Sequence, residues 1–213
     1  MTRRLGKDKK LLLVPSEIVT RLMEISNRQG KPFYGFILEI LEHVLRVYDS
    51  GGSIKEVADF YALFGVVRSL GAKIMPEEAF NHMIGKHYRT ERNVLMEKWR
   101  EFGRLCGESL MTKYKDPVEA LSKFLAIVEC NLNEVEVTSE GGAVKIRCAS
   151  PILSAENTEL LASFIDGLMQ GLNYKTRKQD YVRGIISLEY ERMADSSLPD
   201  KAIPSRLDRK VLR

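Results

Sequence analysis

The side chains able to do acid–base or metal chemistry are few and scattered along the sequence. The three histidines are His43, His82 and His87, and the last two stand five residues apart in a segment of helical character. Five residues of α-helix correspond to about 500° of rotation, which takes the two rings off a common face. A helical metal-binding pair is spaced i, i+4. We therefore expect no metal site and structural roles for the histidines.

The cysteines and the catalytic motifs lead to the same expectation. Cys106, Cys130 and Cys148 stand alone, with no C-x-x-C pair, which favours buried thiols in a reducing cytoplasm. The sequence has no G-x-S-x-G, P-loop, H-E-x-x-H or glycine-rich dinucleotide motif. We predict that the protein is not an enzyme, has no catalytic residues and carries no cofactor.

The net charge of +4 is concentrated at the amino end. The first ten residues carry five basic side chains and one acidic one, so the remaining chain sums to zero. The basic residues are Arg3, Arg4, Lys7, Lys9 and Lys10. Such an arm can contact DNA phosphates and release counterions, or it can be a solvated tail. Both interpretations stay open from the sequence.

Residues 9–47 predict a strand, a helix, a tight turn and a second helix. The apolar run Leu11–Val14 is followed by Pro15 and Ser16, with Ser16 placed to cap the first helix. Gly30 suits a left-handed residue after that helix, and Pro32 suits the first turn of the next one. One strand and two helices of this size cannot close a core alone, so we expect two chains to pair their strands.

This pattern resembles the ribbon-helix-helix (MetJ/Arc/CopG) repressors, in which two paired strands enter the DNA major groove. The resemblance implies a homodimer and DNA as a partner. If Leu12 and Val14 face the core, Lys9, Leu11 and Leu13 face outward, where the family usually has polar base-reading side chains. Pro32 also stands where the family often has Ser or Thr. The DNA-binding candidates are Arg3, Arg4, Lys7, Lys9, Leu11, Leu13 and Lys31.

Residues 51–90 predict a helical connector after the Ser50–Ser53 break. Ser53 and Glu56 form a capping-box pattern for a helix from Ile54 to about Leu70, and Pro76 opens another helix. The segment shows helical packing patterns and no chemistry. We therefore assign it to the connection between two domains.

Residues 91–192 predict an α+β domain. A long helix carries Gly103 and Gly107, four residues apart, and a helix from about 157 to 172 repeats this spacing at Gly167 and Gly171. Alternating residues on both sides of a Gly-Gly turn predict one hairpin, and a second hairpin closes the domain. The expected fold is helices packed on a four-stranded antiparallel sheet.

The order of these elements resembles the 4-vinyl reductase small-molecule-binding domain. The resemblance implies a pocket for a small apolar ligand, although the cysteine-containing ending of that family is missing here. The candidate ligand-binding residues are Trp99, Phe102, Cys106, Phe164 and Met169. The same residues form ordinary core in many proteins, so that alternative stays open.

Two functions follow from these expectations. The first is a dimeric DNA-binding transcriptional regulator with a C-terminal small-molecule-sensing domain. The second is a dimeric ligand-binding or scaffold protein whose ribbon serves only to join chains. With no apolar run of about 20 residues, we expect no membrane partner and a cytoplasmic location. Residues 193–213 read as a polar, flexible tail without an assigned role.

Overall fold

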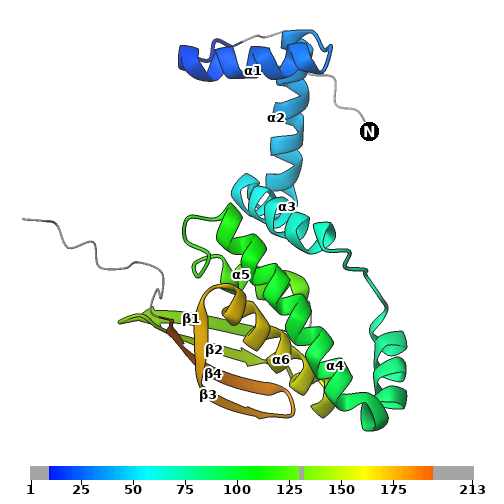
Figure 1. The fold of residues 1–213 in the computed structure, drawn as a ribbon. Helices are drawn as coiled ribbons and strands as arrows, with labels where there is room; N and C mark the ends of the chain where they lie inside the picture. The colour runs from blue at the N-terminus through cyan, green and yellow to red at the C-terminus, as the bar shows by residue number, and fades with distance from the viewer. Residues whose placement is uncertain (1–9, 130–131, 194–213) are drawn as a thin grey trace, which may run out of the picture. The chain divides into compact units, whose positions relative to one another are not determined.

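The computed structural model describes residues 10–129 and 132–193, and within them the protein is α+β (Figure 1). The chain divides between Asp59 and Phe60 into two compact units. The predicted tail, apart from Met193, lies outside the described residues, as do Arg3, Arg4, Lys7, Lys9 and Cys130. None of the described helices is long and apolar enough to cross a bilayer.

The N-terminal unit contains two amphipathic helices, α1 (Ser16–Arg28) and α2 (Phe33–Asp49). Gly30 has a φ of +65°, as predicted for the turn between them. The predicted cap is wrong. Ser16 is the first residue of α1, Pro15 precedes it, and no side chain caps the helix.

The predicted strand is not formed in the described residues 10–14, which have no regular secondary structure. A strand needs a neighbour to take up its N–H and C=O groups, and no described segment of the same chain pairs with this one. The N-terminal unit therefore begins, as described, with helices. A ribbon-helix-helix arrangement is not formed within one chain.

Helix α3 (Ile54–Ser69) crosses the boundary between the units, and its predicted capping box is confirmed. The backbone N–H of Glu56 donates to Ser53 Oγ at 3.2 Å, and the N–H of Ser53 donates to Glu56 Oε2 at 2.8 Å. The second half of α3 contributes Leu63, Val66 and Val67 to the core of the C-terminal unit.

Helix α4 (Glu77–Lys113) joins two predicted helices through a bend at Glu91, where φ is −122° and ψ is 19°. After a turn in which Asp116 Oδ1 accepts the N–H of Glu119 at 3.1 Å, α5 spans Leu121–Val128. Helix α6 (Ala155–Gly171) is capped by Ser154, whose side chain accepts the N–H of Asn157 at 3.1 Å.

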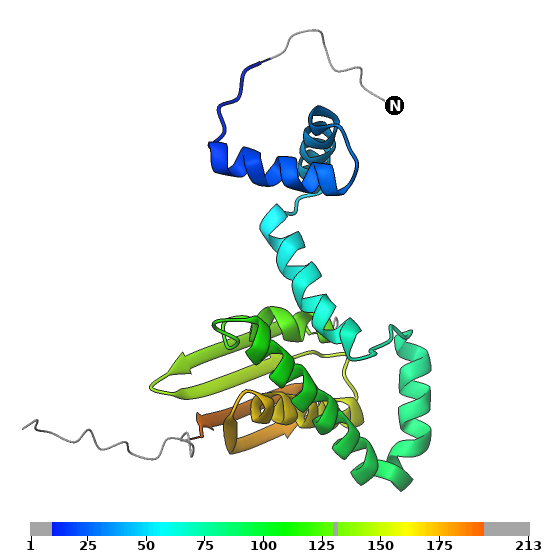
Figure 2. The same ribbon diagram turned by 45° about the horizontal axis from the view of Figure 1, so that its top comes forward.

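Four strands form the predicted antiparallel sheet in the order β1-β2-β4-β3. They are β1 (Glu134–Glu140), β2 (Ala143–Ala149), β3 (Tyr174–Val182) and β4 (Ile185–Arg192). Figure 2 shows α4 and α6 on one face of this sheet. Val144, Ile146 and Cys148 of β2 and Ile186, Leu188 and Tyr190 of β4 are buried toward the core. The other face carries cross-strand ion pairs, such as Lys175–Glu191 at 3.0 Å and Lys145–Glu189 at 3.3 Å.

Glycine allows α4 and α6 to touch backbone to backbone. A Cβ added at Gly103 would overlap the carbonyl oxygen of Phe164, and one added at Gly167 would overlap that of Arg100. A Cβ added at Gly107 would overlap Leu168 and Gly171, which follow Phe164 along α6. Contacts that advance along both chains together show that the two helices run in the same direction. The four-residue glycine spacing of both helices therefore lies where their two backbones meet.

We predict that Gly167→Ala lowers the free energy of unfolding by about 1–3 kcal/mol or more, because the new methyl group has no space between two backbones. Gly85→Ala is the matched control. A Cβ at Gly85, in helix α4, meets nothing within 4 Å, so this change should stabilise the protein by about 0.5–1 kcal/mol. Urea unfolding measures both, and equal effects would contradict the close approach of the two helices.

Candidate functional site

The described DNA-binding candidates differ in their surroundings. Leu11 and Leu13 are 90% and 88% exposed. Lys31 instead forms an ion pair with Glu39 of α2, with Nζ 2.6 Å from Oε2. The hydrogen bond from Lys31 lowers the pKa of the Glu39 carboxyl below its ordinary value. The structure therefore gives Lys31 an intramolecular partner, whereas the two leucines have open surroundings.

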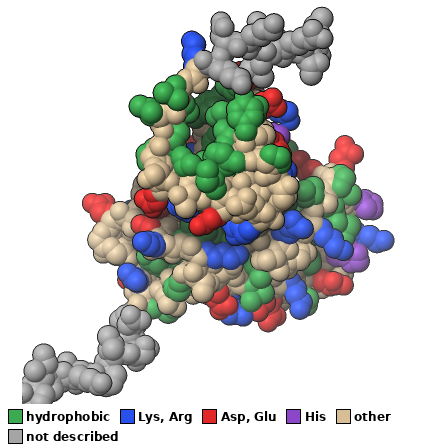
Figure 3. Space-filling view, turned by 90° about the horizontal axis from the view of Figure 1, so that it is seen from above, with side chains coloured by type: hydrophobic (Ala, Val, Ile, Leu, Met, Phe, Trp, Pro, Cys, Tyr) green, Lys and Arg blue, Asp and Glu red, His purple; other side chains and the backbone are tan. Residues whose placement is uncertain are grey.

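The N-terminal unit has almost no interior of its own. Among its described residues, 10–59, only Ser26 and Phe36 are buried. Figure 3, which views the molecule from above, shows hydrophobic side chains gathered on the surface. The exposed large apolar residues of α1, α2 and the preceding segment are Leu11, Leu12, Leu13, Val14, Ile18, Met23, Tyr34, Leu41, Leu45 and Tyr48.

The five ligand-binding candidates lie together in the C-terminal unit. Cys106, Phe164 and Met169 are buried in the main core, and Trp99 and Phe102 pack against it while partly exposed. The rings of Phe102 and Phe164 have centroids 5.9 Å apart. Trp99 also packs against a second, smaller cluster. The geometry brings the candidates together, and most of them fill space between α4, α6 and the sheet.

The buried thiols have the properties of core residues. Burial raises the pKa of Cys106 and of Cys148 to about 12 in each case. A thiol is nucleophilic only as the thiolate, so neither is activated at neutral pH. His82 and His87 lie in α4, and the described residues contain no group of three or more His, Cys, Asp or Glu placed to hold a metal ion.

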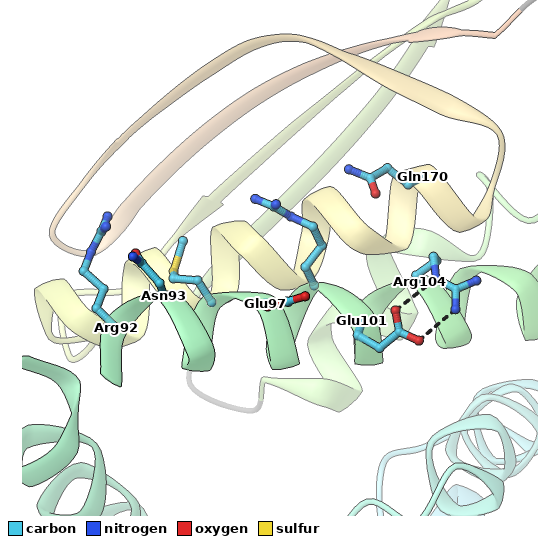
Figure 4. A pocket seen from close by; sticks show the side chains of 8 residues that line it. Arg92, Asn93, Glu97, Glu101, Arg104 and Gln170 are labelled. Atoms are coloured by element: carbon cyan, nitrogen blue, oxygen red, sulfur yellow. Dashed lines mark hydrogen bonds and ion pairs between the residues drawn. The ribbon is translucent and has the colours of Figure 1, made fainter. Parts of the chain in front are cut away.

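Two open cavities of the C-terminal unit are lined by residues other than the five ligand-binding candidates. The larger, of about 550 Å³, is a groove along α4 beside Gln170 of α6 (Figure 4). It is lined by Arg92, Asn93, Met96, Glu97, Arg100, Glu101, Arg104 and Gln170. The smaller, of about 310 Å³, is lined by Asp116, Val118, Glu119, Ser122, Val137 and Ser139.

Carboxylates hold all three arginines of the larger groove. Arg92 pairs with Glu159, Arg100 Nε lies 3.2 Å from Asp166 Oδ2, and Arg104 Nη2 lies 2.8 Å from Glu101 Oε1. Figure 4 shows the last of these pairs. The groove is thus lined by charges that largely neutralise one another, which gives a free anion little net attraction.

Asp166 is the best-anchored of these carboxylates, with an exposed fraction of 4%. Besides Arg100, it accepts hydrogen bonds from Gln170 Nε2 at 2.9 Å, from Gln179 Nε2 at 3.0 Å and from the Thr176 hydroxyl. These donors come from α6 and from β3. Asp166 therefore fixes the edge strand β3 and the Arg100 side chain to the same helix.

Glu159 forms the second polar centre, seven residues before Asp166 on α6. It accepts hydrogen bonds from the Tyr88 hydroxyl, from Arg92 Nε at 3.0 Å and from the Tyr181 hydroxyl at 3.4 Å. Arg92 is the main cause that lowers the pKa of the Glu159 carboxyl. Burial and the neighbouring carboxylate raise the pKa of Tyr88 to about 12. Tyr88 and Arg92 lie on opposite sides of the bend at Glu91.

Glu159 and Asp166 are not among the site residues predicted from the sequence. A signal was present, since two acids seven residues apart fall on the same face of a helix. Carboxylates that recur on one face of a packed helix predict polar partners on the neighbouring elements.

We predict that Glu159 makes the stability of the C-terminal unit depend on acid pH. Its pKa is lowered in the folded protein, so its contribution is complete above the ordinary value of 4.5 and is lost as pH falls through the folded pKa. Glu159→Gln should therefore lower the melting temperature at neutral pH and have a shrinking effect at acid pH. Glu156→Gln, on the same helix, serves as the control. A pH-independent gap between wild type and Glu159→Gln would contradict this.

The comparisons with known proteins add no relative to this picture. Comparison with protein-family models, with curated proteins and with solved structures gave no match for the chain. Any function assigned to the protein therefore rests on its own residues.

Proposed function

We propose that the protein is a dimeric DNA-binding regulator whose C-terminal unit senses a small molecule. The observation that carries the proposal is the exposed run Leu11–Val14 ahead of two helices that bury little beyond Phe36. Burying a leucine side chain is worth about 1.5–3 kcal/mol, so this surface favours a partner. A second copy supplies both a strand to pair and an apolar face to cover.

The choice of a second copy follows from the backbone as well as from the side chains. Residues 10–14 present N–H and C=O groups that pair with no strand in the described part of the chain. Two such segments related by a two-fold axis satisfy each other in a two-stranded ribbon. Leu12 and Val14 then face the four helices, and Leu11 and Leu13 face away from them.

DNA as the partner is supported by the basic arm that leads directly into this run. The five basic side chains of residues 1–10 would be present twice in a ribbon dimer, with one copy of the arm at each end of the antiparallel ribbon. Phosphate contacts of this kind supply affinity without sequence preference. The outward leucines favour the alternative, a dimeric ligand-binding or scaffold protein, because leucine cannot make bidentate hydrogen bonds to bases.

We predict that Leu12→Asp converts the dimer to a monomer in sedimentation velocity, whereas Leu13→Asp leaves it dimeric. The two leucines are neighbours, and both are largely exposed in the single chain, so a monomeric protein would tolerate both changes alike. Only a paired ribbon buries one of them and not the other. Dissociation by both, or by neither, would overturn the proposed ribbon.

We predict that the protein binds random-sequence duplex DNA at low salt, and that replacing Lys7, Lys9 and Lys10 by alanine makes the salt dependence shallower. A plot of log K against log salt has a negative slope. Its magnitude should decrease by about 0.9 for every phosphate that the variant no longer neutralises. Replacing Lys145, Lys175 and Lys178 on the sheet removes the same charge and should not change the slope. No DNA affinity at low salt would leave the scaffold alternative.

A further inference from the structure

The first part of α4 is an arm that stands apart from the rest of its helix. We call residues Glu77–Thr90 the arm, since the helix has non-helical dihedral angles at the next residue, Glu91. Both ribbon views show the chain turning sharply where the arm ends (Figures 1 and 2). Before the arm, residues 70–76 have no helix or strand, and Ile74 there is 90% exposed. The arm is therefore tethered at both ends by joints that lack regular helical geometry.

The arm is held by a hydrophobic cluster separate from the main core. Ile84 and Tyr88 of the arm pack with Leu160 of α6 in this cluster. Phe80 of the arm lies over Trp99, with ring centroids 6.0 Å apart and planes tilted by 38°. Leu95 and Met96 complete the surface beneath it. Lifting the arm would expose this patch without opening the main core.

Two sets of side-chain hydrogen bonds connect the arm to the start of α6. Asn157 Nδ2 donates to Asn81 Oδ1 at 2.6 Å. Glu159 accepts from Tyr88 on the arm and from Arg92 just beyond the bend. A carboxylate that holds both sides of a bend fixes its angle, so Glu159 acts as a latch.

One buried atom under the arm has no partner. Asn157 is 7% exposed, and its Oδ1 finds no hydrogen-bond donor among the described residues. A buried acceptor without a donor costs free energy in the closed arrangement. That cost disappears if a bound molecule supplies the donor.

We propose that the arm is a lid over a ligand site, and that the ligand is a small, mainly apolar, ring-bearing molecule with one hydrogen-bond donor. The ring would replace Phe80 against Trp99, and the donor would reach Asn157 Oδ1. Leu95, Met96 and Leu160 would form the apolar walls. This inference rests on the proposed sensing function and names its site. Of the five ligand-binding candidates from the sequence, it keeps Trp99 at the site and treats the other four as core.

The site has a direct connection to the main core. Trp99 packs against both clusters, and the main core includes Leu63, Val66 and Val67 of α3. A ligand that shifts the Trp99 ring therefore acts on the same core to which the C-terminal half of α3 contributes. A ligand biases an equilibrium only by binding one arrangement better, which here is the one with the lid displaced.

The lid can be tested by opening it without a ligand. Glu159→Gln weakens the latch, and Tyr88→Phe removes one hydrogen bond while leaving the Arg92–Glu159 pair. The control is Glu101→Gln, which breaks an arginine pair on α4 outside the arm. Trp99 is the only tryptophan of the chain, so acrylamide quenching of its fluorescence reports on the lid. The probe of the open site is 1-anilinonaphthalene-8-sulfonate, detected by energy transfer from Trp99.

We expect both latch variants to show stronger quenching, a red shift of Trp99 emission and more probe binding than wild type or Glu101→Gln. Amide hydrogen exchange should accelerate in residues 77–90 while β2, β4 and α6 stay protected. Equal quenching in all four proteins would overturn the lid. So would a loss of protection spread over β2 and β4 in Tyr88→Phe, the milder variant. The measurements need no DNA, so a failure here is distinct from a failure of the wild type to bind DNA.

Discussion

The close packing of α4 against α6 is the constraint on which the C-terminal unit depends. Two helices that run in the same direction gain nothing from their dipoles, so close packing has to hold them together. Glycines at four positions let each backbone approach the carbonyls of the other, which permits Cα–H···O contacts. At this distance the relative rotation of the helices is fixed. That rotation sets Arg100 opposite Asp166 and Arg92 opposite Glu159.

The same packing explains where α4 stops being part of the core. On α4 the glycines that contact α6 begin at Gly103. Nearer Glu91, the residues of α6 that face α4 include the larger Leu160, next to Glu159. Side-chain packing and side-chain hydrogen bonds replace the backbone approach there. Contacts of this kind release more easily than interlocked backbones, because a few side-chain hydrogen bonds and apolar contacts give lower local stability than a continuous backbone interface. A mobile element is therefore expected before the glycine-mediated packing and not within it.

The C-terminal fold could be predicted from the sequence because the residues that form each pattern find their packing partners within the same chain. Val144, Ile146 and Cys148 alternate along β2 because they face the core of the same chain. The glycines at Gly103 and Gly167 lie in the contact between α4 and α6. The N-terminal strand is different, since no described segment of the same chain pairs with it. Glu159 and Asp166 were not predicted because they belong to no catalytic motif and instead pair with arginines far away in the sequence. A helix after Pro76 and a boundary between residues 90 and 91 were predicted, but a bend within one continuous helix was not, since no Pro or Gly marks Glu91.

The regulator and scaffold functions differ in what the outward leucines would do. If a ribbon of two chains entered a major groove, four leucines would meet base edges, and only a thymine methyl offers them a favourable contact. Affinity would then come from phosphates and would be largely independent of sequence. Selectivity among DNA sites would have to arise from sequence-dependent shape or from the spacing of several dimers. Under the regulator proposal, the protein is therefore expected to bind DNA broadly, with the C-terminal unit modulating that binding by ligand.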